Sequence, residues 1–298
     1  MSVLLSGFAD EAAKGLREQI AIHKQFGIHS LEIRNVDGVN IGQMTDAQFE
    51  EVYRILQEEE ITICGFGSAI ANWARPITTD FQKDLDEFQR LIPRMKRVGT
   101  NIIRIMSYPN DGFDEGEWKK QVIHRLSILA AKAEQEGVIL GHENCDGWGA
   151  QSPEHLRILL EEVNSPALQV IFDSGNPIAH GGMTEDVWAF YQAAKPWICH
   201  FHIKDGYRNE KNEVVYCYPG EGWANLKAIM GDLLKSGYRG YFSMEPHIAV
   251  QVHISSEHPE EVDVRGIYEE YCRRTIALAQ DLSYTLAQED ILSMQNFV

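Results

Sequence analysis

The chain has 298 residues, 44% of them hydrophobic, and a formal net charge of −17. This charge argues against non-specific binding to nucleic acid or to anionic membranes, because both need a basic surface. No apolar run approaches the roughly 18 residues that a membrane-spanning helix needs, and the five cysteines form no C-x-x-C pair. Together with an N-terminus that lacks a basic leader, these features predict a reduced, cytoplasmic protein.

Short apolar runs alternate along the chain with charged stretches of helical periodicity. Most of the runs are continuously hydrophobic, which is typical of strands that are covered on both faces. The predicted strands are 3–8, 28–34, 61–67, 101–107, 137–143, 168–173, 197–204 and 239–245. The predicted helices are 15–27, 45–59, 80–99, 118–137, 152–163, 225–237 and about 264–282.

This alternation predicts an α/β fold, a (β/α)₈ TIM barrel. No Gly/Ser-rich linker divides the chain, so we expect a single domain over 1–298. The barrel should occupy about 3–250, followed by a C-terminal loop and helices at 251–298. The alternative is a doubly wound open sheet, which usually has a G-x-G-x-x-G turn after its first strand, whereas SGFADEA has none.

Side chains that commonly bind metals end several of the predicted strands. Glu143, Asp173 and Glu245 end the fifth, sixth and eighth strands, and the seventh carries His200 and His202 on one face. Active sites of such barrels lie at the carboxyl ends of the strands, so these groups should converge. Converging buried carboxylates repel one another unless a cation or protons neutralise them. The pattern therefore predicts one divalent metal ion held by the three carboxylates and one of the two histidines.

The ligand types also indicate the metal and the groups around it. Three oxygens and one nitrogen suit Mn²⁺ or Mg²⁺, with Zn²⁺, Fe²⁺ and Co²⁺ as alternatives. Arg34 at the end of the second strand and His247 after the eighth could contact substrate, and Trp73 and Trp148 could stack against a sugar. Lys204 could bind a phosphate or a keto oxygen, because it adds positive charge beside the carboxylates.

The chain resembles the xylose isomerase-like TIM barrels, a family of sugar phosphate isomerases and epimerases that includes the ketose 3-epimerases. The resemblance covers about residues 3–250 and rests on GFADE (7–11), LEIRNVDG (31–38), GHEN (141–144), FDSGNP (172–177), HIKD (202–205), PGEG (219–222) and MEPH (244–247). In the ketose epimerases, the second histidine of an H-x-H binds the metal and an arginine six residues later contacts substrate. The resemblance thus implies His202 as the ligand and Arg208 as a substrate contact.

The sequence departs from the ketose epimerases at two positions. Asn176 stands where they often have a substrate-binding histidine, although an asparagine can still bind a hydroxyl group. Gly149 stands where they have a glutamate. These differences leave the identity of the substrate open.

The resemblance and the strand-end carboxylates predict a metal-dependent isomerase or epimerase of a keto sugar or sugar phosphate. Glu143 and Glu245 would act as the acid–base pair, removing a proton beside a carbonyl to give a metal-stabilised enediolate. A dehydratase or lyase acting on a related keto polyol or sugar acid is the close alternative, because it begins with the same proton abstraction.

Two further classes of protein function fit the sequence less well. An endonuclease IV-like nuclease needs a basic groove, which the net charge of −17 disfavours. A non-catalytic sugar-binding protein would not need carboxylates on a metal beside its ligand. The expected partner is therefore a small sugar or sugar phosphate, and related barrels lead us to expect a homodimer or homotetramer.

Overall fold

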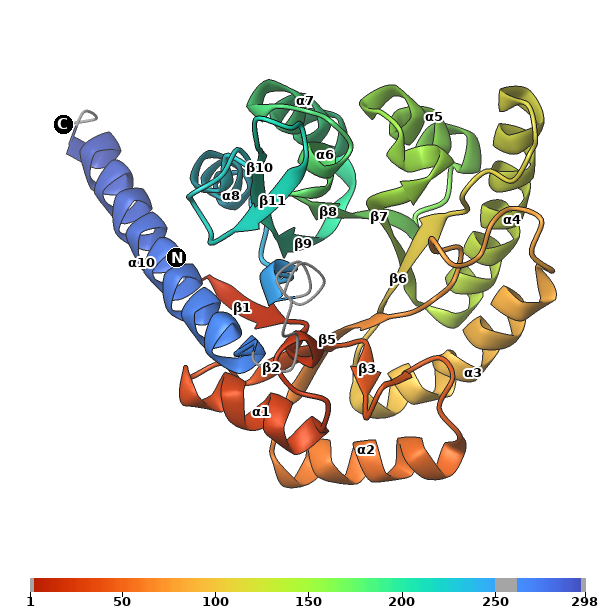
Figure 1. Ribbon diagram of the computed structural model, residues 1–298, viewed down its shortest axis with the longest axis horizontal. Coiled ribbons are helices and arrows are strands. Elements are labelled where there is room, and N and C mark those ends of the chain that lie inside the picture. Colours follow the sequence, from red (N-terminus) through yellow and green to blue (C-terminus); the bar gives the residue numbers. More distant parts are fainter. Residues whose placement is uncertain (1–2, 250–261, 296–298) are drawn as a thin grey trace.

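The computed structural model describes residues 3–249 and 262–295, and in this part of the chain eight parallel strands form a barrel (Figure 1). These strands are β1 (Leu4–Gly7), β2 (Ser30–Ile33), β5 (Thr62–Gly67), β6 (Ile102–Ser107), β7 (Ile139–Gly147), β8 (Leu168–Asp173), β9 (Ile198–Ile203) and β12 (Tyr241–Met244). Each one falls on a run predicted as a strand, and the predicted TIM barrel is confirmed.

The strands are hydrogen-bonded in the order β1-β12-β9-β8-β7-β6-β5-β2. The barrel is nearly closed, because the Ser30 hydroxyl of β2 donates to the Leu5 carbonyl of β1 at 2.7 Å. The strand residues are mostly buried, which explains why their sequences are continuously apolar. The register of β8 and β9 pairs Asp173 with His202, so these two residues lie at the same level of the barrel.

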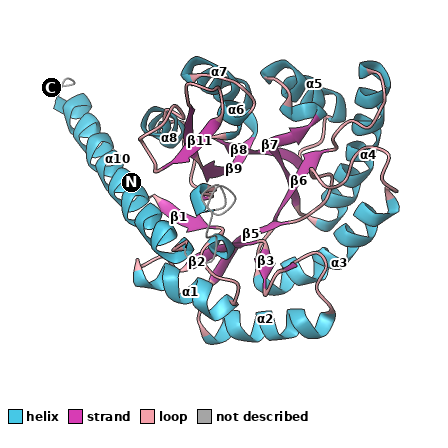
Figure 2. Ribbon diagram, in the orientation of Figure 1, coloured by secondary structure: helices cyan, strands magenta, loops and turns pink. Residues whose placement is uncertain are grey.

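Helices surround the barrel on its outside (Figure 2). They are α1 (Leu16–Gln25), α2 (Asp46–Glu58), α3 (Gln82–Val98), α4 (Glu115–Glu136), α5 (Pro153–Val163), α6 (Asn176–Ala179), α7 (Thr184–Ala194), α8 (Leu226–Lys235) and α10 (Val264–Gln295). The short 3-10 helices are η1 (Ala9–Glu11), η2 (Trp148–Ala150) and η3 (Lys195–Trp197). The sequence patterns missed α6 and α7, because both flank the pair Gly181–Gly182, which is typical of a loop.

The other helix boundaries follow the local sequence. Thr45 begins α2 with a capping box, in which its side chain accepts from the Gln48 amide and the Gln48 side chain accepts from the Thr45 amide. Gly99 and Gly137 end α3 and α4 in the left-handed conformation that glycine adopts at low cost. None of the helices among the described residues is long and apolar enough to cross a membrane.

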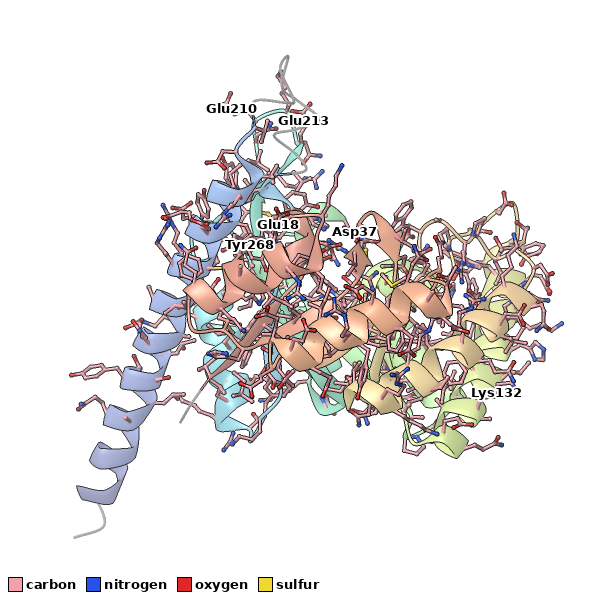
Figure 3. The ribbon with its side chains drawn as sticks, turned by 90° about the horizontal axis from the view of Figure 1, so that it is seen from below. Glu18, Asp37, Lys132, Glu210, Glu213 and Tyr268 are labelled. Atoms are coloured by element: carbon pink, nitrogen blue, oxygen red, sulfur yellow. The ribbon has the colours of Figure 1, made fainter. Side chains whose placement is uncertain are left out.

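Two short hairpins follow barrel strands. They are β3 (Asn35–Val36) with β4 (Val39–Asn40), and β10 (Asp205–Arg208) with β11 (Val214–Cys217). Figure 3 shows that Glu210 and Glu213, at the tip of the second hairpin, stand above the rest of the labelled side chains. The β10–β11 hairpin therefore extends past the carboxyl ends of the barrel strands.

The long helix α10 lies along the side of the barrel and extends beyond it (Figure 1). Its Tyr268 hydroxyl is 2.9 Å from Nε2 of His23, and its Tyr271 hydroxyl donates to the Ile203 carbonyl at 3.0 Å. This helix is longer than the predicted 264–282. Most of the loop predicted to begin at 251 lies outside the described residues.

Candidate metal centre

Four side chains from neighbouring strands converge at the carboxyl end of the barrel. Glu143 lies on β7, Asp173 on β8 and His202 on β9, while Glu245 directly follows β12. Each is at most 2% exposed. One donor atom of each residue lies within 4.8 Å of the donor atoms of the other three. The structure thus brings together the four residues predicted as metal ligands, which we call the ligand cluster.

The donor atoms of the ligand cluster surround Nδ1 of His202. This nitrogen lies 3.5 Å from Glu143 Oε1, 3.3 Å from Glu245 Oε2 and 3.9 Å from Asp173 Oδ2. Among the described residues, the close cationic contacts of Glu143 Oε2, Asp173 Oδ2 and Glu245 Oε2 are the ion pairs with Arg104 and Lys204. A buried set of three carboxylates and one imidazole with converging donor atoms therefore fits a divalent cation.

The backbone around β8 fixes the Asp173 carboxylate. Its Oδ1 accepts hydrogen bonds from the amides of Gly175 and Asn176, both at 2.8 Å, which leaves Oδ2 directed at the cluster. The Asn144 side chain accepts from the Asp173 amide at 2.7 Å and donates to its carbonyl at 2.9 Å. Only glycine fits at 175, because a Cβ there would lie 2.5 Å from Cγ of Lys204. These contacts account for Asp173 and Gly175 in the FDSGN sequence and for Asn144 in the GHEN sequence.

Lys204 is fully buried beside the ligand cluster. Its ammonium lies 2.9 Å from Asp173 Oδ2 and 3.0 Å from Glu245 Oε2, and it donates to Asn176 Oδ1 at 3.2 Å. Burial raises the pKa of Asp173 to about 6 although the Lys204 ammonium opposes the rise, and the charges of Glu245 and Glu143 add to it. One lysine therefore compensates only part of the negative charge of the three carboxylates.

Two arginines face the ligand cluster from other strands. Arg34, which follows β2, lies with Nη1 2.9 Å from Glu245 Oε1, and its guanidinium also binds Asp10 at 2.9 Å and Glu11 at 3.4 Å. Arg104 on β6 lies with Nη1 3.4 Å from Glu143 Oε2. Arg34 was among the predicted site residues. Arg104 was missed, and the signal that could have found it is a single charge inside the apolar run NIIRIMS.

A cavity of about 470 Å³ opens onto the ligand cluster, and Glu143 and Glu245 form part of its wall. The rest of the wall consists of Arg34, Asn35, Asn40, Gln43, Ala69, Asn72, Trp73, Ala74, Arg104, Met106, Cys145 and His247. This volume is in the range of small-molecule sites. The cavity is therefore the candidate substrate site.

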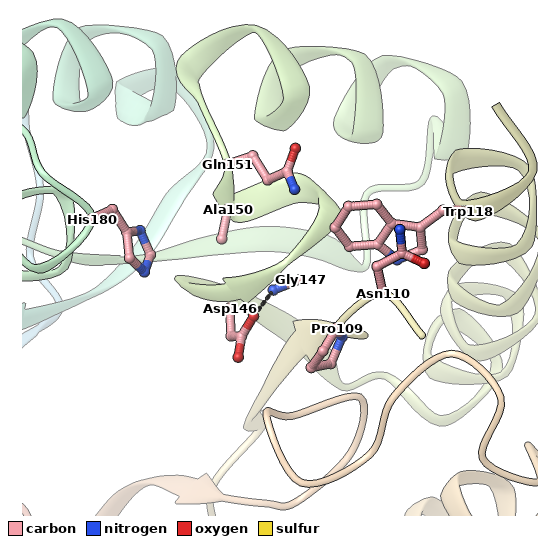
Figure 4. A pocket seen from close by; sticks show the side chains of 8 residues that line it. All are labelled: Pro109, Asn110, Trp118, Asp146, Gly147, Ala150, Gln151 and His180. Carbon is pink, nitrogen blue, oxygen red and sulfur yellow. Dashed lines mark hydrogen bonds between the residues drawn. The ribbon is translucent and has the colours of Figure 1, made fainter. Parts of the chain in front are cut away.

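A second cavity, of about 450 Å³, lies beside the ends of β6 and β7 (Figure 4). Its wall consists of Pro109, Asn110, Trp118, Asp146, Gly147, Ala150, Gln151 and His180. None of the ligand cluster belongs to this wall. The second cavity is therefore not the candidate substrate site.

Besides Arg34 and Lys204, two more of the predicted substrate-binding residues lie at the candidate site. Asn176 donates from Nδ2 to Glu143 Oε1 at 3.2 Å. His247 lines the 470 Å³ cavity, with Nε2 3.3 Å from Glu245 Oε1. Both side chains therefore touch a carboxylate that the sequence assigns to catalysis.

Trp148 and Arg208 are placed differently. Trp148 is 2% exposed and donates from Nε1 to Glu115 at 2.6 Å, and it is not part of the cavity wall, whereas Trp73 is. Arg208 donates to the carbonyls of Ile178 at 2.8 Å and Asn212 at 2.6 Å. These contacts give Trp148 and Arg208 partners within the protein, and the substrate contacts predicted for them from the sequence stay predictions.

The two histidines of β9 have different positions. His202 directs Nδ1 into the ligand cluster, whereas His200 is bound through Nε2 to Glu32 at 2.9 Å, deeper in the barrel. Glu32 also contacts Nε2 of His202 at 3.1 Å. The geometry thus agrees with His202, rather than His200, as the ligand.

Comparison with known sequences places this barrel in a family. The profile of the xylose isomerase-like TIM barrel matches residues 20–267. The chain belongs to this family. The expected family membership is therefore confirmed.

The curated relatives of the chain are enzymes. It is 27% identical over 173 residues to 3-dehydroshikimate dehydratase of Pseudomonas putida, a match that spans 55% of this chain but only 26% of that enzyme. It is 23% identical over 235 residues to inosose dehydratase of Mesomycoplasma hyopneumoniae, with 70% of this chain and 76% of that enzyme covered. It is 26% identical over 117 residues to 2-epi-5-epi-valiolone 7-phosphate 2-epimerase of an Actinoplanes species, with 39% and 41% covered.

Solved structures share the fold at low sequence identity. A xylose isomerase-like TIM barrel protein from Mycobacterium smegmatis in complex with magnesium has a TM-score of 0.70 at 16% identity, with 95% of this chain and 98% of that one covered. The IOLI protein with a bound zinc atom has a TM-score of 0.69 at 17% identity, with 94% and 98% covered. D-Psicose 3-epimerase with D-tagatose from Clostridium cellulolyticum has a TM-score of 0.66 at 15% identity, with 95% and 99% covered.

Proposed function

We propose that the protein is a divalent-metal-dependent enzyme that removes a proton from the carbon beside the carbonyl of a keto sugar or keto polyol. The observation that supports the proposal is the buried ligand cluster, in which three carboxylates and one imidazole bring a donor atom each within 4.8 Å of the others. Relatives named as dehydratases and an epimerase support it, because dehydration and epimerisation beside a carbonyl both begin with loss of that proton.

The roles of the two glutamates follow from their places in the barrel. A divalent ion held by the ligand cluster would supply Lewis acidity to the substrate carbonyl oxygen. Glu143 and Glu245 come from β7 and the end of β12, which β8 and β9 separate, so their carboxylates reach the cavity from different sides. One can therefore accept the proton while the other returns one.

Neighbouring groups orient these carboxylates and add polar contacts for the substrate. Asn176 donates to Glu143 Oε1, and Arg34 donates to Glu245 Oε1 at 2.9 Å. Lys204 and His247 lie against Glu245 and are proposed to bind substrate oxygens. A charged donor on a substrate oxygen contributes about 1.5–3 kcal/mol, enough to select a substrate with a hydroxyl at that place.

The charges on the cavity wall favour an unphosphorylated substrate. Its two arginines, Arg34 and Arg104, both face carboxylates of the described residues, Glu245 and Glu143 respectively. Arg34 also binds Asp10 and Glu11. The Arg34 guanidinium, shared among three carboxylates, is therefore not left to form the bidentate contacts that recognise a phosphate group.

Two reaction outcomes can follow the shared first step. The proton can return to the opposite face, which is epimerisation, or a hydroxyl on the next carbon can leave, which is dehydration. One observation favours dehydration: at Gly149, where the ketose epimerases have a glutamate, a Cβ would lie 2.5 Å from Leu159 Cδ2. A side chain there would require Leu159 to move, and this chain has no carboxylate at that position, which agrees with the dehydratase relatives.

Isotope exchange tests this proposal. The Mn²⁺-loaded protein is incubated with a panel of keto sugars and keto polyols in D₂O, and the products are followed by NMR and by ultraviolet absorbance. Epimerisation should place deuterium on the carbon beside the carbonyl of the product, whereas dehydration removes the hydrogen of that carbon and gives an absorbing unsaturated ketone. Protein treated with a chelator serves as the control. Turnover without exchange and without an isotope effect at that carbon would contradict the proposal.

A further inference from the structure

Glu32 on β2 lies deeper in the barrel than the ligand cluster and is 2% exposed. Its carboxylate contacts two imidazoles of β9. Nε2 of His202 lies 3.2 Å from Oε1 and 3.1 Å from Oε2, and Nε2 of His200 lies 2.9 Å from Oε2. One buried carboxylate thus joins the predicted ligand His202 to His200, which lies outside the ligand cluster.

The contact decides which nitrogen of His202 carries the proton. An ionised carboxylate only accepts hydrogen bonds, so the imidazole that touches it donates from Nε2. When the imidazole is neutral, Nδ1 of the same ring is then the unprotonated nitrogen, and it points at the carboxylates of the ligand cluster at 3.3–3.9 Å. Metals bind the unprotonated nitrogen of a neutral imidazole. The tautomer set by Glu32 is therefore the one that can bind a metal.

The surroundings limit rotation of the His202 ring. Phe8 packs edge-on against it, with ring centroids 5.2 Å apart and an interplanar angle of 73°. His200 is perpendicular to it at 5.4 Å and holds Glu32 in place through its own Nε2. Since Glu32 is the acceptor for both rings, the pair of histidines fixes the carboxylate and the carboxylate fixes His202.

We propose that Glu32 is a positioning residue for the metal centre. It holds His202 in the tautomer and orientation that direct Nδ1 to a metal, and it increases the basicity of that nitrogen. Partners of this kind typically change metal affinity by about 10- to 100-fold when they are replaced. This inference rests on the proposed function, because it requires that the ligand cluster binds a metal.

Calorimetric titration of metal-free protein with Mn²⁺ tests the role of Glu32. Glu32→Gln should bind Mn²⁺ about 10- to 100-fold more weakly than the wild type. The matched control is Glu87→Gln, which alters a carboxylate that is also 2% exposed but binds the Ala69 amide and Arg75 instead of a ligand. Glu87→Gln should leave the affinity unchanged.

A second readout separates positioning from general damage to the fold. Nitrogen-15 NMR of the metal-free protein, at a pH high enough for His202 to be neutral, should show the ring protonated on Nε2 in the wild type and a mixture of both tautomers in Glu32→Gln. If Glu32→Gln does not fold, Glu32→Asp, whose shorter carboxylate stands farther from His202, should show the same changes in affinity and tautomer.

The outcomes distinguish this inference from the proposed function. A wild-type protein that binds no Mn²⁺ would contradict the proposed function. A wild-type protein that binds Mn²⁺, with unchanged affinity and unchanged His202 tautomer in the Glu32 variants, would contradict only the role of Glu32. Weaker Mn²⁺ binding by the Glu32 variants, together with a changed His202 tautomer, supports both the proposed function and the role of Glu32.

Discussion

The two sides of the barrel contribute opposite charges to the candidate site. β7, β8, β9 and the end of β12 supply the ligand cluster, with its three carboxylates. The opposite side, at β2 and β6, supplies Arg34 and Arg104, whose guanidinium groups face Glu245 and Glu143. We call these the carboxylate side and the arginine side.

The comparison shows how the charges are compensated on each side. The Arg34 guanidinium is shared among Asp10, Glu11 and Glu245, so it balances the N-terminal acids as well as the site. On the carboxylate side, the Lys204 ammonium is shared between Asp173 Oδ2 at 2.9 Å and Glu245 Oε2 at 3.0 Å, so one positive charge serves two carboxylates. The arginine side therefore orients the carboxylates without satisfying them, which leaves a place for a divalent cation.

The largest expected loss of turnover comes from substitutions of the glutamates on the carboxylate side. Glu143→Gln and Glu245→Gln should each lower turnover by about 10²- to 10⁴-fold, because each removes one member of the acid–base pair. Turnover of the substrate identified in D₂O is measured together with metal content. Glu115→Gln, outside the ligand cluster, is the control, and a variant of either glutamate that kept full turnover would contradict its role.

Changing the arginine side should reduce stability. Arg34→Met leaves Asp10, Glu11 and Glu245 without their shared partner, and breaking a buried ion pair in this way costs about 3–5 kcal/mol. Urea unfolding of the metal-free protein measures the loss. Arg17→Met, which breaks exposed pairs with Glu58 and Glu59, should change stability little. Equal stability of both variants would show that Arg34 does not compensate the buried acids.

The pH dependence of metal binding should follow Asp173. Burial raises its pKa to about 6, so below that pH a proton competes with the metal for this carboxylate. Mn²⁺ affinity should fall as the pH falls through about 6, by roughly tenfold per pH unit for one displaced proton. Titrations across this range measure the slope. Affinity that stays constant on acidification to about pH 5 would contradict the assignment of Asp173 as a ligand with this pKa.

The smallest expected effect is on kcat/KM, in a comparison that tests whether Arg208 reaches the substrate. Lys204→Met removes the ammonium beside Asp173 and Glu245 and should lower kcat/KM by about 10- to 100-fold, whereas Arg208→Ala should lower it less. Steady-state kinetics of both variants give the comparison. A greater loss in Arg208→Ala would mean that this arginine reaches the substrate, as the resemblance implied, and not only the carbonyls of Ile178 and Asn212.

The barrel and the convergence of the ligand cluster could be predicted because both depend on periodic or local features. Continuous apolar runs define strands that are buried on both faces, and carboxylates that directly follow such runs must meet at one end of a barrel. The fold confirmed the strands, and the geometry brought Glu143, Asp173, His202 and Glu245 together.

The rest of the site depends on contacts between strands that are distant in sequence. Arg104 stands out as a charge in an apolar run, but only the barrel shows that it faces Glu143. Similarly, Trp148 and Trp73 look equivalent in the sequence, yet loop conformation puts Trp73 on the cavity wall and buries Trp148 against Glu115. The β10–β11 hairpin, which the periodicity did not indicate, determines the contacts of Arg208.

The most direct test of the central claim is a crystal structure of the protein soaked in Mn²⁺, with anomalous scattering used to locate the ion. We expect one anomalous peak per chain, at ligand distances of roughly 2.0–2.3 Å from the donor atoms. Those donors should be carboxylate oxygens of Glu143, Asp173 and Glu245 and Nδ1 of His202. A peak at other residues, or no peak in fully soaked crystals, would contradict the account.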